Sequence, residues 1–195
     1  MSETNILLCG VGGQGTVLAS RLIAAAAMKK NIPVKTAETI GMSQRGGSVV
    51  SHIRLGDVYA PQIGLGKADL IIGFEPAETL RMLPYLKEGG TVVVSNRPVK
   101  PVSANIGIST YKEAEILAYL QDHVQHLYLV DADKALTALG NAKCLNVVLL
   151  GVAVCSNALP LSVQDITEAI KEKVPQKFQE LNFAALQYEA APKGE

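Results

Sequence analysis

The sequence predicts an α/β fold built on a mostly parallel but mixed β-sheet. Three observations lead to this prediction. Short apolar runs alternate along the chain with segments of helical periodicity. A glycine loop joins the first apolar run to the first helical segment, which is typical of a βαβ unit. An alternating segment at 48–55 precedes a Gly56-Asp57 turn, and this combination indicates one antiparallel hairpin.

The βαβ unit opens the chain. Its parts are an apolar strand (6–9), a glycine loop (10–15), an Ala-rich helix (16–30) and a second strand (34–37). Lys29 and Lys30 suit the negative end of the helix dipole. Pro33 cannot continue a helix, so the helix is expected to end just before it.

The predicted hairpin follows the βαβ unit. A polar loop (40–47) leads into the alternating strand (48–55), and residues 58–60 are expected to return beside it. Residues 70–74 then form a buried strand. Glu75-Pro76 opens the next helix, because Pro is favoured in the first turn, and Gly89-Gly90 lies beyond the end of that helix.

The second half of the chain continues the alternation. Strands are expected at 91–95 and 127–130. Helices are expected at 111–123, 131–139, 144–158 and 176–188, and one more is expected to begin after the capping sequence 162–165. The helix at 144–158 is apolar almost all round, so it must be buried on every side, either as a central helix or under a partner. The complete pattern predicts a three-layer Rossmann-like sandwich.

Composition limits the kind of protein. The 195 residues suit one domain, expected to span 1–190, with a disordered tail at 191–195. Lys plus Arg and Asp plus Glu number 18 each, and no basic run is present, which argues against a nucleic-acid-binding protein. No stretch approaches the roughly 18 continuous apolar residues of a membrane span. The first residues do not resemble a signal peptide, so we expect a cytoplasmic protein.

Three cysteines, Cys9, Cys144 and Cys155, are scattered along the chain. An odd, scattered set argues against a disulfide framework. No C-x-x-C spacing is present, so the chain has no iron–sulfur or metal-ligand pattern. We expect all three to be small, buried apolar side chains.

The glycine loop is the first candidate binding site. Gly10, Gly12 and Gly15 satisfy G-x-G-x-x-G between a strand and a helix, and Gly13 and Gln14 complete the loop. Glycines allow close backbone approach, and the helix N-terminus then offers free N–H groups to an anion. The alternative is a tight turn that binds nothing. If the anion belonged to NAD, Glu38 would be the candidate for the ribose.

The second candidate site is the loop that contains Ser43, Gln44, Arg45, Gly46 and Gly47. The guanidinium of Arg45 matches carboxylate or phosphate, so the loop suits an anionic substrate or the surface of a partner. The alternative is a hairpin entry in which the glycines serve turn geometry alone. His52, in the following strand, is interpreted as a packed or surface residue. No catalytic triad or metal-ligand spacing is visible.

These two loops together resemble the small-subunit family of 2-oxoacid:acceptor oxidoreductases. The resemblance continues through Gly64-Leu65-Gly66-Lys67-Ala68-Asp69 and Gly73-Phe74-Glu75-Pro76-Ala77-Glu78, and it spans most of the chain. The second loop reads Met42-Ser43-Gln44-Arg45-Gly46-Gly47, which is similar to the beta subunits of the indolepyruvate type. It differs from the Glu-Arg or Glu-Ala-Arg loops of the pyruvate and ketoisovalerate types.

The resemblance implies a division of labour in a ferredoxin-dependent complex. A large alpha subunit would hold thiamine diphosphate and [4Fe-4S] clusters. The complex would decarboxylate an arylpyruvate, join the acyl group to coenzyme A and pass electrons to ferredoxin. This chain would carry no cofactor and no complete active site, and its two loops would contact coenzyme A or the partner.

Two other functions remain open from the sequence alone. One is an autonomous NAD(P)-dependent oxidoreductase that uses the glycine loop and Glu38. The other is a catalytically silent module that only binds a partner. The first predicts that NAD or NADP raises the melting temperature of the isolated chain, because a ligand that binds only the native state stabilises it.

Overall fold

The computed structural model describes residues 3–41, 47–100, 110–141 and 144–188. Six strands form one sheet: β1 (Thr4–Val11), β2 (Val34–Ile40), β3 (Ser48–Leu55), β4 (Ala68–Gly73), β5 (Leu86–Ser95) and β6 (His126–Val130). The α-helices are α1 (Thr16–Lys29), α2 (Pro76–Met82), α4 (Glu113–His123), α5 (Ala132–Leu139), α6 (Leu145–Cys155), α7 (Val163–Lys173) and α8 (Gln179–Leu186). Short 3-10 turns, Leu83–Tyr85 and Gln176–Phe178, follow α2 and precede α8.

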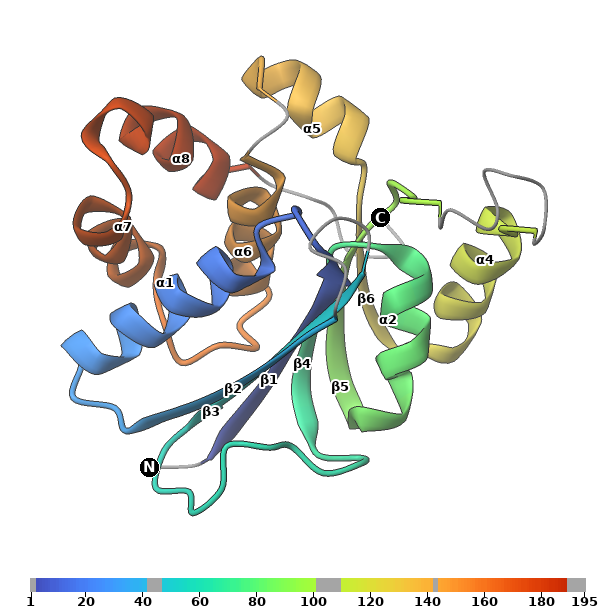
Figure 1. The fold of residues 1–195 in the computed structure, drawn as a ribbon, viewed down its shortest axis with the longest axis horizontal. Coiled ribbons are helices and arrows are strands. Elements are labelled where there is room, and N and C mark those ends of the chain that lie inside the picture. The colour runs from blue at the N-terminus through green and yellow to red at the C-terminus, as the bar shows by residue number, and fades with distance from the viewer. Residues whose placement is uncertain (1–2, 42–46, 101–109, 142–143, 189–195) are drawn as a thin grey trace.

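The strand order is β2-β3-β1-β4-β5-β6 (Figure 1). β1, β4, β5 and β6 pair in parallel, and β3 pairs antiparallel with both β1 and β2. Five strands therefore point the same way and β3 alone runs against them. This arrangement confirms the mostly parallel, mixed α/β sheet expected from the sequence.

The position of the antiparallel hairpin was predicted wrongly. The hairpin consists of β2 and β3, whereas residues 58–60 form no strand. The physical reason is that β3 already has a hydrogen-bonded strand on each edge, so no edge is left for a returning strand. The chain after β3 instead forms a loop that the side chains of β3 hold in place.

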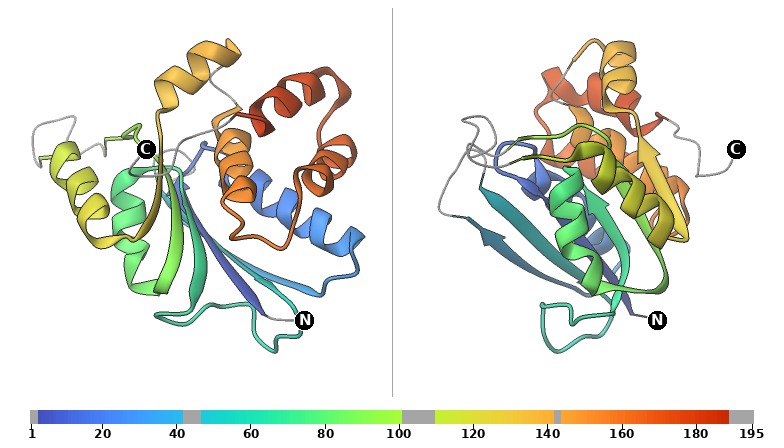
Figure 2. Two further views of the ribbon diagram at one scale, coloured as in Figure 1. Left: turned by 180° about the vertical axis from the view of Figure 1, so that it is seen from behind. Right: turned by 90° about the vertical axis from the view of Figure 1, so that its right-hand side faces the viewer.

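Helices cover both faces of the sheet (Figures 1 and 2). α2 and α4 pack on one face, around Leu7, Ile71 and Val92. α1 and the helices after β6 pack on the other face, and α6 lies at their centre, in contact with α1, α5, α7 and α8 and with two strands. The apolar helix is thus buried by the chain itself, and it needs no partner to cover it.

The cysteines fit the prediction with one exception. Cys9 and Cys144 are buried, and burial raises the pKa of both thiols, so neither is a reactive thiolate near neutral pH. Cys155, however, is exposed. It is the last residue of α6, where the helix leaves the core, and this position explains the wrong prediction.

The C-terminal helix is shorter than the segment predicted at 176–188, since it begins with a 3-10 turn and ends at Leu186. The tail expected at 191–195 lies outside the described residues. Among the described residues, no helix combines the length and apolar character required to cross a bilayer.

Candidate functional site

The candidate site lies at the carboxyl edge of the sheet, where β1 and β4 end side by side. The chain after β1 enters α1 on one face of the sheet, and the chain after β4 enters α2 on the other face. In open α/β sheets, ligands bind where consecutive crossovers diverge in this way. The glycine loop occupies this point.

Three glycines of the loop serve its geometry. Gly13 and Gly15 have φ angles of 97° and 84°, a region that favours glycine. A Cβ on Gly10 would lie 2.8 Å from Cβ of Phe74, so only glycine allows β1 to approach the end of β4 this closely.

The side chain of Gln14 holds the glycine loop at the point where the chains after β1 and β4 diverge. Its Oε1 accepts the N–H of Val11 at 2.8 Å, and its Nε2 donates to the carbonyl of Phe74 at 2.9 Å. The side chain therefore links β1 to the end of β4. Both ends of the amide form a hydrogen bond within the protein, which gives Gln14 a structural role; its predicted ligand contact stays a prediction.

Two helix N-termini beside the loop lack any stabilising acid. α1 starts at Gly15 and α6 at Cys144, and neither has a side-chain cap or an acidic residue in its first turn. The other α-helices of the described chain each have one or the other. Asn146 connects the two bare ends by donating from Nδ2 to the carbonyl of Gly15 at 3.5 Å. Unsatisfied N–H groups and two positive dipole ends therefore converge here.

Two hollows flank the glycine loop. One, of about 460 Å³, is lined by Gly13, Gln14, Gly15, Leu18, Arg97, Val99, Leu145 and Asn146. The other, of about 320 Å³, is lined by Val11, Gly12, Gly13, Gly15, Thr16, Val17 and Val49. Arg97 is exposed and brings a guanidinium to the first hollow. Thr16, only 3% exposed, lines the second, and within the described chain its hydroxyl makes no hydrogen bond.

The base of the second loop meets the glycine loop. The N–H of Gly12 donates to the carbonyl of Gly47 at 2.8 Å, which brings the two predicted sites together. Ser43, Gln44, Arg45 and Gly46 lie outside the described residues. Ser48, which follows Gly47, donates from its hydroxyl to Oε2 of Glu78 at 2.6 Å.

A buried carboxylate organises the neighbouring segments. Glu75, 1% exposed, caps α2 by accepting the N–H of Glu78 at 2.9 Å. It also accepts the N–H of Val99 at 3.4 Å and the phenol of Tyr111. Burial, reinforced by the adjacent Glu75 carboxylate, raises the pKa of Tyr111, so the phenol stays protonated and donates. Through its bond to Val99, Glu75 holds in place the segment after β5, which brings Arg97 and Val99 to the glycine loop.

The structure separates Glu38 from the glycine loop. In a dinucleotide fold, the ribose-binding acid ends the strand next to β1. Here β3 lies between β1 and β2, and Glu38 is in register with Ser51 of β3, which is in register with Leu8 of β1. Two strand spacings, roughly 10 Å, separate Glu38 from β1. This arrangement disfavours the NAD(P) alternative.

His52 has a structural position, as the sequence indicated. It is buried, and its Nδ1 accepts the N–H of Ile63 at 3.2 Å. Burial lowers the pKa of the imidazole. No group of three or more His, Cys, Asp or Glu side chains within the described ranges is placed to hold a metal ion.

Several residues of the site could not be found from the sequence. Arg97, Thr16 and Asn146 stand in unrelated segments, and no motif connects them. Glu75 was recognised only as a helix start. The signal for Arg97 and Glu75 was positional: both follow the carboxyl end of a predicted parallel strand, where binding residues gather.

Comparisons with known proteins show the family to which this chain belongs. The family model for pyruvate ferredoxin/flavodoxin oxidoreductase matches residues 5–190. Indolepyruvate oxidoreductase subunit IorB of Pyrococcus horikoshii is 41% identical over 188 residues, covering 95% of this chain and 93% of the relative. The IorB subunit of Thermococcus kodakarensis is 40% identical over 190 residues, covering 96% and 94%.

A solved structure shares the fold. The gamma subunit of a keto/oxoacid ferredoxin oxidoreductase from Geobacter sulfurreducens superposes with a TM-score of 0.69 at 21% identity, covering 96% of this chain and 94% of that one. The family match covers nearly the whole chain, and the two relatives match 95% and 96% of it. The chain therefore belongs to the pyruvate ferredoxin/flavodoxin oxidoreductase family.

Proposed function

We propose that this chain is the cofactor-free subunit of a ferredoxin-dependent 2-oxoacid oxidoreductase of the indolepyruvate type, working in the cytoplasm. The complex would convert an arylpyruvate to an acyl-CoA by oxidative decarboxylation. The observation that carries the proposal is the 40–41% identity to two IorB subunits over nearly the whole chain. The bare helix ends at the carboxyl edge support a role in binding an anionic ligand.

We assign the redox and thiamine chemistry to a large alpha subunit. Thiamine diphosphate would stabilise the carbanion left by decarboxylation, and [4Fe-4S] clusters would carry the electrons to ferredoxin. The described residues of this chain offer no three-ligand group for a metal, and its three cysteines lie far apart in the sequence. The described residues do not fit a cluster, so no electron-transfer step is assigned to this chain.

The part of this chain would be to hold the phosphates of coenzyme A. Free N–H groups at the starts of α1 and α6 would donate to phosphate oxygens. Thr16 would add a hydroxyl, and Arg97 a cation that balances the phosphate charge. Within the glycine loop, Gly10 and Gln14 would shape the backbone, and Gly12, Gly13 and Gly15 would permit close approach.

The second loop would complete this contact or meet the alpha subunit. Its last glycine, Gly47, is bound to Gly12, so Ser43, Gln44, Arg45 and Gly46 immediately precede a residue fixed at the site. If Arg45→Ala leaves both assembly and the KM for coenzyme A unchanged, this assignment is wrong.

The decisive experiment is co-expression with the candidate alpha subunit. The assay follows viologen reduction that depends on an arylpyruvate and on coenzyme A, and we expect activity only when both chains are present. Arg97→Ala should raise the KM for coenzyme A about tenfold or more, since bonds to charged groups are worth about 1.5–3 kcal/mol. Thr16→Val should raise it less, about threefold to tenfold. Arg21→Ala, an exposed arginine of α1 away from both hollows, is the matched control.

Full activity from the alpha subunit alone, or the absence of a complex, would overturn the subunit proposal. Unchanged KM values for Arg97→Ala and Thr16→Val in an active complex would overturn the phosphate assignment alone. A rise in the melting temperature of the isolated chain with NADH but not with coenzyme A would restore the NAD(P) alternative.

A further inference from the structure

The loop between β3 and β4, residues 56–67, presents exposed apolar side chains on a fixed backbone. Tyr59 is fully exposed, at 101%, and Leu65 is 67% exposed. Val58 and Ile63 of the same loop are buried, at 6% and 4%, so they tie it to the core. The loop lies at the amino edge of the sheet, at the opposite end from the glycine loop (Figure 1).

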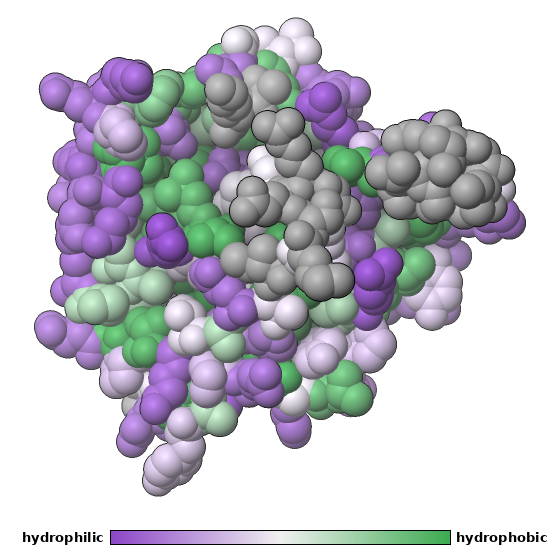
Figure 3. Space-filling view, viewed as in Figure 1, coloured by the Kyte–Doolittle hydropathy of each residue, from purple (hydrophilic) through white to green (hydrophobic). Residues whose placement is uncertain are grey.

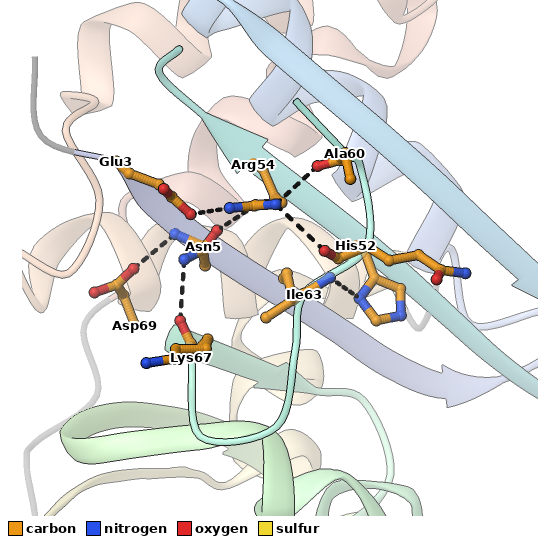
Figure 4. A network of polar contacts seen from close by, with 9 residues as sticks. Glu3, Asn5, His52, Arg54, Ala60, Ile63, Lys67 and Asp69 are labelled. Carbon is orange, nitrogen blue, oxygen red and sulfur yellow. Dashed lines mark hydrogen bonds and ion pairs between the residues drawn. The ribbon is translucent and has the colours of Figure 1, made fainter. Parts of the chain in front are cut away.

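A polar network fixes the backbone of this loop (Figure 4). Arg54 Nη1 donates to the carbonyls of Ala60 at 2.9 Å and Gln62 at 3.4 Å. Asn5 Nδ2 donates to the carbonyl of Lys67 at 3.1 Å, and the N–H of Ile63 donates to His52 at 3.2 Å. These bonds hold the middle and the end of the loop.

Two charges beside the loop are paired within the chain, and two exposed charges, Asp57 and Lys67, stand at its ends. Arg54 pairs with Glu3, and Asp69 pairs with Lys87. Residues 58–66 contain no Asp, Glu, Lys or Arg. In Figure 3 the lower edge of the molecule, where this loop lies, shows green apolar side chains among purple polar ones. The surface that fits residues 58–66 is therefore apolar at its centre, with polar groups opposite Asp57 and Lys67 at its rim; a nucleic-acid backbone, which requires clustered basic residues, fits this stretch poorly.

We infer that Tyr59 and Leu65 dock this chain onto the large alpha subunit of its oxidoreductase complex, in an apolar pocket that offers an acceptor to the Tyr59 hydroxyl. Three observations favour a protein subunit. Exposed tyrosine is characteristic of interface hot spots. The loop backbone is already ordered, so association loses little conformational entropy. The relatives are named as subunits, so a protein partner exists for their family.

The location of the loop gives this docking a useful property. A stable interface needs roughly 800 Å² from each partner, so the loop would form its centre and the surrounding amino edge its rim. The carboxyl edge, with the two hollows, stays outside this contact. The chain could therefore be held firmly without blocking the entry of an anionic ligand.

The test measures the Kd between this full-length chain and the purified alpha subunit. Tyr59→Ser should raise the Kd about thirtyfold or more, as expected of a hot spot, and Leu65→Ser should raise it about tenfold. Tyr59→Phe keeps the ring and should raise it less than Tyr59→Ser. Met28→Ser and Tyr119→Ser remove exposed apolar groups, 66% and 46% exposed, from α1 and α4, and should change it less than about threefold.

The inference rests on the proposed function, and the outcomes separate the two. If the wild-type chains form no complex, both fail. If the wild-type complex forms and Tyr59→Ser binds as tightly as Met28→Ser, only the docking inference is overturned. If Tyr59→Ser instead abolishes self-association of this chain and leaves the Kd for the alpha subunit unchanged, the loop binds a second copy, and the inference is again overturned. The circular dichroism of each variant should match the wild type.

Discussion

Gln14 offers a direct test of whether the glycine loop is held by its own side chain. The sequence indicated a ligand contact at Gln14. In the structure, both ends of its side-chain amide form hydrogen bonds within the protein, at 2.8 Å with Val11 and 2.9 Å with Phe74. Gln14→Ala removes both bonds. Each is worth about 1 kcal/mol net, so the free energy of unfolding should fall by about 2 kcal/mol.

Gln14→Glu isolates one of the two bonds. The carboxylate can still accept from Val11, but an oxygen replaces the Nε2 donor and faces the carbonyl of Phe74. Two acceptors in contact should lower the free energy of unfolding by about 1–3 kcal/mol at pH 7. The carbonyl also raises the pKa of the new carboxyl, so this loss is present above its pKa and shrinks as the pH falls and the protonated group donates again.

Urea denaturation at pH 7 and pH 4.5 measures these differences, each against the wild type at the same pH. Gln121→Ala, an exposed glutamine of α4, is the control and should stay within about 0.5 kcal/mol. The reasoning is refuted if Gln14→Ala is as stable as the control while the complex shows a raised KM for coenzyme A. That result would support a contact between Gln14 and the ligand.

Three further predictions concern the core, the loop at the amino edge and the buried carboxylate. Gly151→Ala should lower the free energy of unfolding by about 1–3 kcal/mol, because the new Cβ would lie 2.3 Å from the backbone oxygen of Leu186, so α8 must move; an unchanged urea midpoint would contradict this. The free energy of unfolding should fall as the pH drops below about 6.5, because His52 is protonated in the unfolded state before it is protonated in the folded state. His52→Asn should weaken this pH dependence between pH 7.5 and 5.5. If the free energy of unfolding of the variant changes with pH as steeply as that of the wild type, His52 is not the source. Tyr111→Phe should lower the free energy of unfolding by about 1.5–3 kcal/mol, the value of a hydrogen bond to a charged group. The control Tyr119→Phe, at a 46% exposed residue of α4, should change it little. If thermal denaturation shows the same loss of stability for both variants, the contact between Tyr111 and Glu75 is not supported.

The layered fold was largely predictable because its signals are local. The run at 6–9, the glycines and the Ala-rich helix each follow from nearest-neighbour preferences, and all three occupy their expected places. The apolar helix at 144–158 indicated a buried element, and α6 is indeed buried, in contact with four other helices. What failed was the pairing of β3. Pairing depends on which edges remain free after the whole sheet has formed, and a two-residue turn cannot reveal that.

The site was half predictable for a related reason. The glycine loop is contiguous, so its pattern is visible in one segment. Arg97 and Asn146 reach the same hollow only because β5 ends, and α6 begins, beside the start of α1. The missing N-terminal caps of α1 and α6 were readable in the sequence, but their convergence depends on tertiary packing.

The hairpin of β2 and β3 has a consequence for how this family can diversify. The N–H of Gly41 donates to the carbonyl of Ser48 at 2.9 Å, which closes the hairpin, and Gly12 holds Gly47. We therefore expect that exchanging, lengthening or shortening the sequence between these two anchors leaves the register of the seven residue pairs in β2 and β3 unchanged. The hairpin tip would then be exchangeable beside the glycine loop that we propose as the anion-binding site. Transplanting a tip from one subunit type to another should alter ligand or partner choice while stability stays nearly the same.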